Sequence, residues 1–248
     1  MSANAVLITG TSSGIGLALA QALAGRSWDV LGIARRPAAF EHPRYMHIQS
    51  DLGDADGLEA LAGDRLEPWL REEGRDRIGL VNNAAVIGGL RRIGILDPRR
   101  LQRMFAVNVT APITLMGLVI RSAPREARIR IVNVSSGAAQ APFPGLGDYS
   151  ATKAALRLAG MTAATEFRDL GWSPRRAAVL SFEPGLVDTA MQDEARAADP
   201  EAFPSRQAFV EFAARGQLQP PSAVAGDVAR FLEEDPRDHW TERRFGDG

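Results

Sequence analysis

Short apolar runs alternate with segments of helical periodicity along most of the 248-residue chain. A continuous apolar run of about four to eight residues is typical of a strand buried on both faces, whereas apolar residues three and four positions apart indicate an amphipathic helix. The runs that predict strands are residues 5–9, 29–34, 45–48, 77–81, 129–134 and 177–182. Because these strands alternate with helical segments, the pattern predicts an α/β protein with a doubly wound parallel sheet.

The segments between the strands predict five helices and one loosely patterned region. The expected helices are residues 17–25, 54–72, 98–120, 149–170 and 224–232. Pro112 should kink or divide the third of them, because proline lacks the backbone N–H and clashes with the preceding turn. Residues 190–219 are charged, alanine-rich and interrupted by prolines, so we expect one or two short helices that form a lid over the substrate. With no repeat or linker, residues 1–248 should form a single domain, and residues 240–248 show only a weak strand pattern.

Composition narrows the class of function. Twenty-nine basic and 30 acidic residues give a net charge of −1, which offers no field to attract nucleic acid or an anionic membrane. There is no cysteine, so disulfides, thiolate nucleophiles and cysteine-based metal sites are excluded. We see no signal-peptide pattern and no apolar run that approaches the roughly 18 residues of a membrane helix. These features predict a soluble, cytoplasmic protein without nucleic-acid or membrane partners.

A glycine-rich turn, Gly10-Thr-Ser-Ser-Gly-Ile-Gly16, joins the first predicted strand to the first helix. In a dinucleotide-binding turn, the first glycine permits a tight turn, the second lets the backbone approach the pyrophosphate, and the third lets helix pack on strand. The helix N-terminus then presents N–H groups to the phosphates. The alternative is an ordinary glycine turn, which the flanking strand and helix disfavour. The residues predicted to bind the dinucleotide here are Gly10, Ser12, Ser13, Gly14, Ile15 and Gly16.

Arg35 and Arg36 follow the second strand, where the adenosine ribose lies in folds of this kind. An acidic residue there would hold the ribose 2′-hydroxyl, whereas arginine can pair with a 2′-phosphate. We therefore predict a preference for NADPH over NADH. The alternative is a pair of solvated surface arginines in an arginine-rich chain. Asp51 and Leu52, after the third strand, are expected to meet the adenine ring.

Two asparagines stand out in apolar surroundings. Asn82 ends the fourth strand and can tie neighbouring strands together through side-chain hydrogen bonds. The spacing of Asn108 within an apolar helix favours a satisfied core amide over a functional one. The small residues that would let the backbone pass beneath a nicotinamide ribose are Asn83, Ala84 and Ala85.

Tyr149 and Lys153 are one helical turn apart, so both side chains leave the same face of the helix. An ammonium held near a phenol lowers the pKa of the phenol from about 10 towards neutrality, which suits acid–base chemistry on a carbonyl. Lys153 is the only lysine in the chain, and arginine cannot replace a compact ammonium beneath a ribose. Ser136, at the end of a strand, can add a second hydrogen bond to the same oxygen. Alone, such a pair would more often decorate a helix surface.

Taken together, residues 9–16 and 82–85, Asn108, Ser136 and the Tyr149/Lys153 pair resemble the short-chain dehydrogenase/reductase superfamily over nearly the whole chain. The resemblance implies a three-layer Rossmann fold. Residues 140–149 and 183–196 are similar to the sepiapterin reductase and benzil reductase subgroup, whose members reduce vicinal dicarbonyl compounds with NADPH. The chain departs from the mammalian pterin reductases at two positions, which favours an unspecialised ketone or diketone reductase. Those positions are Ser13, where they carry arginine, and Arg244, which lies near their pterin-anchoring acid.

The resemblance also implies roles. Tyr149 would donate the proton to the carbonyl oxygen as hydride arrives from the nicotinamide, Lys153 would lower the pKa of Tyr149 and hold the ribose, and Ser136 would orient the carbonyl. Asn108 would position a water that refills the proton through Lys153, an implication that outweighs the core-amide interpretation. The residues implied to border the nicotinamide are Pro184, Gly185, Val187 and Thr189, the last two holding its carboxamide. No metal is required.

The predicted function is thus an NADPH-dependent reductase of a small ketone or vicinal diketone. Two alternatives stay open: a related oxidoreductase acting on 3-oxoacyl, sugar or steroid-like substrates, and a non-catalytic dinucleotide sensor on the same fold. The resemblance further implies a homodimer, or a tetramer, through the helices that carry Asn108 and Tyr149. Four residues suit close helix approach there but would fit the sheet equally well; they are Ala151, Ala154, Ala155 and Leu158.

Overall fold

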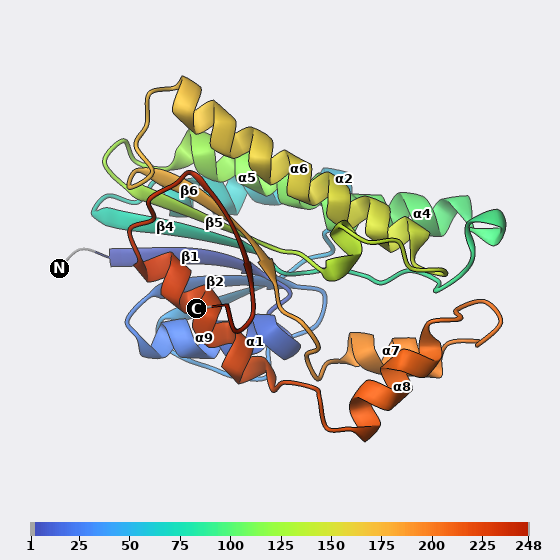
Figure 1. Ribbon diagram of the computed structural model, residues 1–248. Helices are drawn as coiled ribbons and strands as arrows, with labels where there is room; N and C mark the ends of the chain where they lie inside the picture. The colour runs from blue at the N-terminus through green and yellow to red at the C-terminus, as the bar shows by residue number, and fades with distance from the viewer. Residues whose placement is uncertain (1–2, 248) are drawn as a thin grey trace.

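Seven parallel strands form one sheet in the computed structural model, which describes residues 3–247 (Figure 1). The strands are β1 (Ala3–Thr9), β2 (Asp29–Ala34), β3 (Tyr45–Gln49), β4 (Arg75–Asn82), β5 (Arg128–Val134), β6 (Ala177–Glu183) and β7 (Trp240–Arg244). Their order is β3-β2-β1-β4-β5-β6-β7, so the direction of winding reverses between β1 and β4. In open sheets, ligands bind beyond the carboxyl ends of the strands at such a reversal. The expected doubly wound Rossmann-type fold is confirmed.

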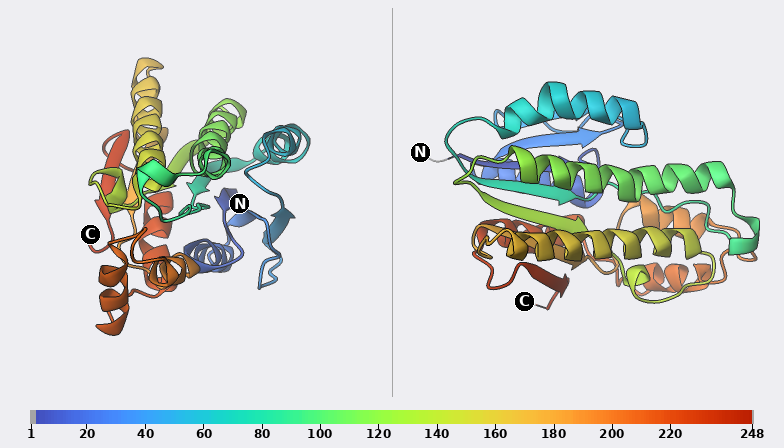
Figure 2. Two further views of the ribbon diagram at one scale, coloured as in Figure 1. Left: turned by 90° about the vertical axis from the view of Figure 1, so that its right-hand side faces the viewer. Right: turned by 90° about the horizontal axis from the view of Figure 1, so that it is seen from above.

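Helices cover both faces of the sheet and give three layers (Figure 2). The helices are α1 (Gly14–Gly25), α2 (Ala55–Leu61), α3 (Glu67–Leu70), α4 (Pro98–Phe105), α5 (Ala111–Ser122), α6 (Gly147–Asp169), α7 (Ala190–Ala197), α8 (Arg206–Ala214) and α9 (Pro221–Glu233). On one face α1 and α9 pack together over Leu19 and Phe231. On the other, α2, α5 and α6 enclose a second core around Leu115 and Phe167. Continuous apolar strands are required because both faces of the sheet are buried.

Two predicted helices contain a π-helical turn. Residues 54–72 divide into α2, a π-helix η1 (Ala62–Leu66) and α3. The helix from Pro98 contains a π-helix η3 (Ala106–Thr110) immediately before α5, whose first turn holds Pro112. The expected disturbance at Pro112 is therefore confirmed, and it takes the form of a widened turn, where the missing N–H interrupts the normal bonding.

The helix that spans α4, η3 and α5 corrects one expectation. Within residues 3–247, Pro98–Ser122 is long and apolar enough to cross a membrane by length and composition, with a mean hydropathy of 1.6, whereas we expected no such run. Its threonines and glycine interrupt the apolar run without lowering the average much. A buried core helix meets the same criterion, and Leu115, Leu118 and Val119 of this helix are fully buried against the sheet.

The last third of the chain contains the least clearly patterned elements. Residues 190–219 hold the two short helices α7 and α8, as expected, and these lie beyond the carboxyl ends of the strands (Figure 1). The weak strand pattern of the tail becomes β7, which pairs in parallel with β6 from Val179–Trp240 to Glu183–Arg244. As an edge strand, β7 carries exposed charged residues, which explains why its apolar pattern is weak.

Candidate active site

The glycine-rich turn after β1 has the backbone geometry of a phosphate-binding turn. Gly10 and Gly14 have φ angles of 79° and 58°, in the left-handed region that favours glycine. A Cβ atom at Gly16 would lie 2.4 Å from the carbonyl oxygen of Gly10, so even alanine would force the turn away from α1. Ile15 is buried in the core between the sheet and α1. The first turn of α1 therefore directs its N–H groups outwards, towards the carboxyl edge of the sheet.

The two arginines after β2 lie beside this turn. Arg36 Nη2 donates a hydrogen bond to Ser13 Oγ at 3.2 Å, so the end of β2 and the turn are in contact. Both Arg35 and Arg36 are exposed, Ser12 is half-buried, and within residues 3–247 neither arginine forms an ion pair with a carboxylate. Two cations are thus free to meet an anion at the adenosine end of the turn.

Asp51 forms an ion pair with Arg103, which the sequence around Asp51 does not indicate. Its carboxylate lies 2.7 Å from Arg103 of α4 and accepts the Gly53 N–H at 2.9 Å. Partial burial raises the pKa of Asp51, but these two hydrogen bonds outweigh it and hold the pKa below its usual range. Leu52 is buried in the core. The predicted contact of Asp51 and Leu52 with adenine stays a prediction, and Arg103 joins this end of the site.

Thr9 organises the segment that follows β4. Its hydroxyl accepts the N–H groups of Asn83 and Ala84, each at 3.0 Å, while Asn83 Nδ2 donates to the Thr9 carbonyl at 2.9 Å. The half-buried run Asn83, Ala84 and Ala85 is thereby held against the glycine-rich turn. Asn82 Nδ2 donates to Asn133 Oδ1 at 2.8 Å, which confirms the expected tie between neighbouring strands.

Asn108 lies in the π-helix η3 and is 1% exposed. Its amide forms two hydrogen bonds with the backbone of Val86: the oxygen accepts the Val86 N–H at 2.9 Å, and the nitrogen donates to the Val86 carbonyl at 2.8 Å. It also donates to Thr152 Oγ1 of α6 at 3.2 Å. The side chain is therefore a satisfied core amide that joins the loop after β4 to α6. The water-positioning role implied by the resemblance stays a prediction.

Tyr149 and Lys153 lie on one face of α6, as their spacing predicts. Both are buried, with 6% and 3% exposure. Lys153 Nζ lies 5.6 Å from the centre of the Tyr149 ring and donates a hydrogen bond to the Val134 carbonyl at 2.7 Å. The end of β5 thus aims the ammonium towards the phenol.

The electrostatics of this pair differ from the expectation that Lys153 brings the pKa of Tyr149 towards neutrality. Burial raises the pKa of Tyr149 to about 12, with the Ser136 hydroxyl acting in the opposite direction. Burial also lowers the pKa of Lys153 to about 8. Since the lysine loses its proton before the tyrosine titrates, it does not favour the phenolate at high pH. At neutral pH, the pair is a neutral phenol beside an ammonium.

Ser136 and the lid complete the surroundings of the phenol. Ser136 follows β5, and its Oγ accepts the Ala138 N–H at 3.2 Å at the start of a 3₁₀ turn, η4 (Gly137–Ala139). The Tyr149 hydroxyl contacts Met191 Sδ of α7 at 4.0 Å. An apolar cluster around the phenol joins the loop after β4, α6 and the lid; it contains Ile87, Leu90, Met104, Ala138, Leu146, Tyr149, Ala195 and Phe203.

The segment after β6 runs from the sheet to the lid and passes the glycine-rich turn. Val187 is buried and forms a parallel bridge with Gln219, so both ends of the lid are joined. Thr189 begins α7, and its Cγ2 lies 3.3 Å from where a Cβ at Gly14 would be. Pro184 is half-buried, and Gly185 is exposed with a φ of 69°. The structure therefore brings Thr189 to the predicted dinucleotide site.

The roles of three residues at the site are not predicted from the sequence: Thr9, Arg103 and Met191. Thr9 belongs to the run 9–16 that resembles the family motif, but no role of its own is predicted for it; a hydroxyl directly before a glycine-rich turn is the signal that indicates one. Arg103 and Met191 reach the site from α4 and α7, at separations of 52 residues from Asp51 and 42 from Tyr149. No local pattern indicates contacts of that range.

Comparison with known proteins agrees with this geometry. The family model for short chain dehydrogenases matches residues 4–200. The benzil reductase ((S)-benzoin forming) of Bacillus subtilis is 30% identical over 232 residues, covering 92% of this chain and 93% of that protein. Sepiapterin reductase of Bos taurus is 30% identical over 249 residues, covering 92% and 89%. The crystal structure of a short chain dehydrogenase/reductase from Saccharomyces cerevisiae superposes with a TM-score of 0.82 at 23% identity, covering 98% and 96%. The chain therefore belongs to the short-chain dehydrogenase/reductase family, whose members are oxidoreductases that use a nicotinamide dinucleotide.

Proposed function

We propose that this protein is an NADPH-dependent carbonyl reductase that reduces a ketone or vicinal diketone, with Tyr149 as the general acid. The observation that carries the proposal is the placement of Tyr149 and Lys153 on one buried face of α6, beneath an apolar cluster that the lid completes. The similarity to a benzil reductase and a sepiapterin reductase supports a dicarbonyl substrate. An apolar surround favours a substrate with apolar or aromatic groups on the carbonyl.

The residues present fit the dinucleotide. The glycine-rich turn is a cradle that a Cβ atom would fill, and it would hold the pyrophosphate at the start of α1. Arg35 and Arg36 would hold a 2′-phosphate, and Lys153 the nicotinamide ribose. Val187 and Thr189 would hold the carboxamide. When bound, the reduced dinucleotide supplies the hydride.

The chain's own groups then move the proton. With its pKa raised to about 12, the Tyr149 hydroxyl keeps its proton at neutral pH and can donate it to the carbonyl oxygen. The Lys153 ammonium lies 5.6 Å from the ring centre. At a separation of about 6 Å and an effective dielectric of 20, a positive charge stabilises a phenolate by about 3 kcal/mol. Lys153 therefore favours loss of the proton during the reaction, and Ser136 holds the carbonyl oxygen in place.

A substrate panel tests the function directly. Sepiapterin, benzil, diacetyl and a 3-oxoacyl thioester are each incubated with NADPH, and the loss of NADPH absorbance is followed. We expect turnover of one or more of the diketones at a higher kcat/KM than the thioester. Faster turnover of the thioester would favour the alternative substrate class, and NADPH binding without any turnover would favour a dinucleotide sensor.

The cofactor preference rests on Arg35 and Arg36. The double substitution Arg35→Ala/Arg36→Ala should lower kcat/KM for NADPH by about 100-fold or more and leave that for NADH nearly unchanged, since each of the two charge-assisted hydrogen bonds contributes about 1.5–3 kcal/mol. Arg44→Ala is the matched control, because Arg44 is similarly exposed but pairs with Asp29 at 2.8 Å, at the other end of β2. A wild-type enzyme that uses both cofactors equally, or prefers NADH, would contradict the proposal.

The assembly we propose is a homodimer formed through α5 and α6. Ala151, Ala154 and Leu158 of α6 are exposed, Leu158 by 63%, so they do not pack on the sheet of their own chain. Ile113 of α5 is 43% exposed. Covering these apolar groups with a second copy is favourable by about 25 cal/mol per Å². The molar mass in solution should be twice that of one chain, and a monomeric mass would count against this assembly.

A further inference from the structure

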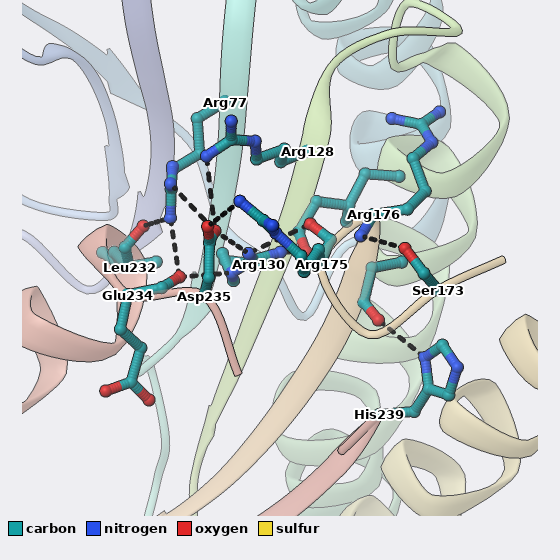
Figure 3. Close-up of polar contacts among 12 residues, drawn as sticks. Arg77, Arg128, Arg130, Ser173, Arg175, Arg176, Leu232, Glu234, Asp235 and His239 are labelled. Atoms are coloured by element: carbon teal, nitrogen blue, oxygen red, sulfur yellow. Dashed lines mark hydrogen bonds and ion pairs between the residues drawn. The ribbon is translucent and has the colours of Figure 1, made fainter. Parts of the chain in front are cut away.

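The amino ends of the strands, opposite the site above, carry a concentration of positive charge. Among residues 3–247, four arginines converge on the carboxylate of Asp235, which follows α9 (Figure 3). Arg77, Arg128 and Arg130 lie 3.4, 3.3 and 3.2 Å from Oδ1, and Arg175 lies 2.9 Å from Oδ2. We refer to these five residues as the Asp235 cluster. The guanidinium of nearby Arg176 points away from it, towards the Pro124 carbonyl.

The two inner arginines have a structural task. Arg130 is fully buried and donates to the carbonyls of Ile129, Arg175 and Glu234. Arg77 is 9% exposed and donates to the carbonyls of Leu232 and Glu234 at 3.0 and 2.8 Å. Both therefore satisfy carbonyl groups at the C-terminal end of α9, where cations are favoured by the helix dipole.

The two outer arginines, Arg128 and Arg175, make no comparable hydrogen bonds to backbone carbonyls among the described residues. The side chains of Arg128 and Arg175 are 45% and 71% exposed. Within the described residues, the guanidinium of each bonds only to Asp235. Each therefore keeps N–H donors directed to solvent on either side of one carboxylate.

Within the Asp235 cluster, four guanidinium groups share one carboxylate. The carboxylates next to Asp235 in sequence are engaged elsewhere: Glu233 pairs with Arg26 at 3.2 Å and Glu234 pairs with Arg243. Arg77 and Arg128 are also paired across β4 and β5, which places like charges side by side. In agreement, burial and neighbouring arginines lower the pKa of Arg130 to about 10. The cluster thus holds more cations than anions in a chain whose net charge is −1.

We propose that the Asp235 cluster binds a small phosphate-class oxyanion between Arg128 and Arg175. A phosphate group, free or as the monoester of a small metabolite, presents several oxygens that match the planar donor forks of arginine. The exposed carboxylates Asp76, Glu126 and Asp238 lie close to cluster residues in sequence, and they disfavour an extended polyanion. Because the cluster is at the opposite end of the strands from the glycine-rich turn, it would be occupied together with the dinucleotide.

Thermal unfolding in phosphate tests the proposal. The protein is saturated with NADP⁺ or NAD⁺ so that the dinucleotide site is filled, and Tm is measured in inorganic phosphate, in glycerol phosphate and in chloride at matched ionic strength. Saturating phosphate should raise Tm by about 5 °C over chloride. If glycerol phosphate raises it as much, a metabolite monoester is accepted; if only inorganic phosphate does, the ligand is the free ion. No rise with either would overturn the proposal.

A double substitution of the two outer arginines tests whether phosphate binds at the Asp235 cluster. Arg128→Ala/Arg175→Ala removes exposed side chains, so the chain should fold, and the phosphate-induced rise should disappear. The matched control is Arg71→Ala/Arg100→Ala, whose side chains are 60% and 65% exposed and form ion pairs on other helices. The control should keep the full rise. Equal rises in all three proteins would place the anion elsewhere and overturn the proposal.

A substitution at Asp235 distinguishes an anion-binding site from a purely structural contact. Asp235→Ala should lower Tm in chloride, because Arg77 and Arg130 lose the one carboxylate that pairs with them among residues 3–247. Phosphate should restore part of this loss, giving a larger rise than in the wild type. Equal losses in chloride and phosphate would show that the cluster only holds the end of α9. If the alanine variant does not fold, Asp235→Asn allows the same comparison.

Discussion

Tyr149→Phe should reduce carbonyl turnover by about 1,000-fold or more while leaving dinucleotide binding within a few-fold of the wild type. The substitution removes only the hydroxyl, which is the group that we propose donates the proton. The ring that packs among Ile87, Leu146 and Phe203 is kept, so the apolar cluster should stay intact. Steady-state kcat, with the dissociation constant of NADPH measured by fluorescence titration, separates the two effects.

The second tyrosine of the chain supplies the control. Tyr45 Oη hydrogen-bonds to Thr11 Oγ1 of the glycine-rich turn and to His47 Nδ1, each at 2.9 Å. Tyr45→Phe likewise removes one phenolic hydroxyl, here with part-buried hydrogen bonds, but should keep kcat within a few-fold. Wild-type turnover in Tyr149→Phe, or an equal loss in both variants, would refute the role of Tyr149 as the acid.

Lys153→Met should abolish turnover and yet make the protein without dinucleotide more stable at pH 7, with Tm higher by roughly 4–8 °C. Burial lowers the pKa of Lys153 from 10.5 to about 8. Keeping the charged ammonium in the folded chain therefore costs about 3 kcal/mol at pH 7. Methionine is similar in size and carries no charge. Loss of the hydrogen bond to the Val134 carbonyl offsets about 1 kcal/mol of the gain.

The stability difference should depend on pH in a defined direction. Because the pKa of Lys153 is lower in the folded chain, the unfolded chain binds more protons between about pH 8 and pH 10.5. Over this range, the wild type should become more stable relative to Lys153→Met, and below pH 8 the difference should be constant. Tyr149, with its pKa raised to about 12, lowers stability above about pH 10 in both proteins and cancels in the comparison.

Chemical unfolding of both proteins at half-unit steps from pH 6 to pH 10 measures this difference. A variant less stable than the wild type at pH 7, or a difference that does not change with pH, would show that the ammonium is not destabilised by burial. A gain in stability together with loss of activity would show that the enzyme gives up stability to keep a charge beneath its site.

The elements that could be predicted are those whose cause is local. The glycine-rich turn follows from backbone angles that only glycine adopts readily, and the shared face of Tyr149 and Lys153 follows from a four-residue separation. Strand boundaries shifted by one or two residues, as in β4, which runs from Arg75 to Asn82. Backbone pairing with β1 and β5 extends the strand past its apolar run. The edge strand β7 gave a weak pattern because none of its residues is fully buried and Glu242 and Arg244 are exposed.

The contacts that could not be predicted join residues that are far apart in sequence. The contacts of the Asn108 amide with Val86 and Thr152 follow from the fold and have no signal in the local sequence. The pairing of Asp51 with Arg103 and the convergence of four arginines on Asp235 likewise depend on elements that meet only in three dimensions.

By itself, the sequence determined the α/β architecture, the glycine-rich turn and the shared helix face of Tyr149 and Lys153, since periodicity, glycine content and helical spacing act over a few residues. Only the tertiary structure decided the electrostatics of that pair. Desolvation depends on everything packed around a group, and it raises the pKa of Tyr149 and lowers that of Lys153, opposite to what their proximity alone suggests for the phenol.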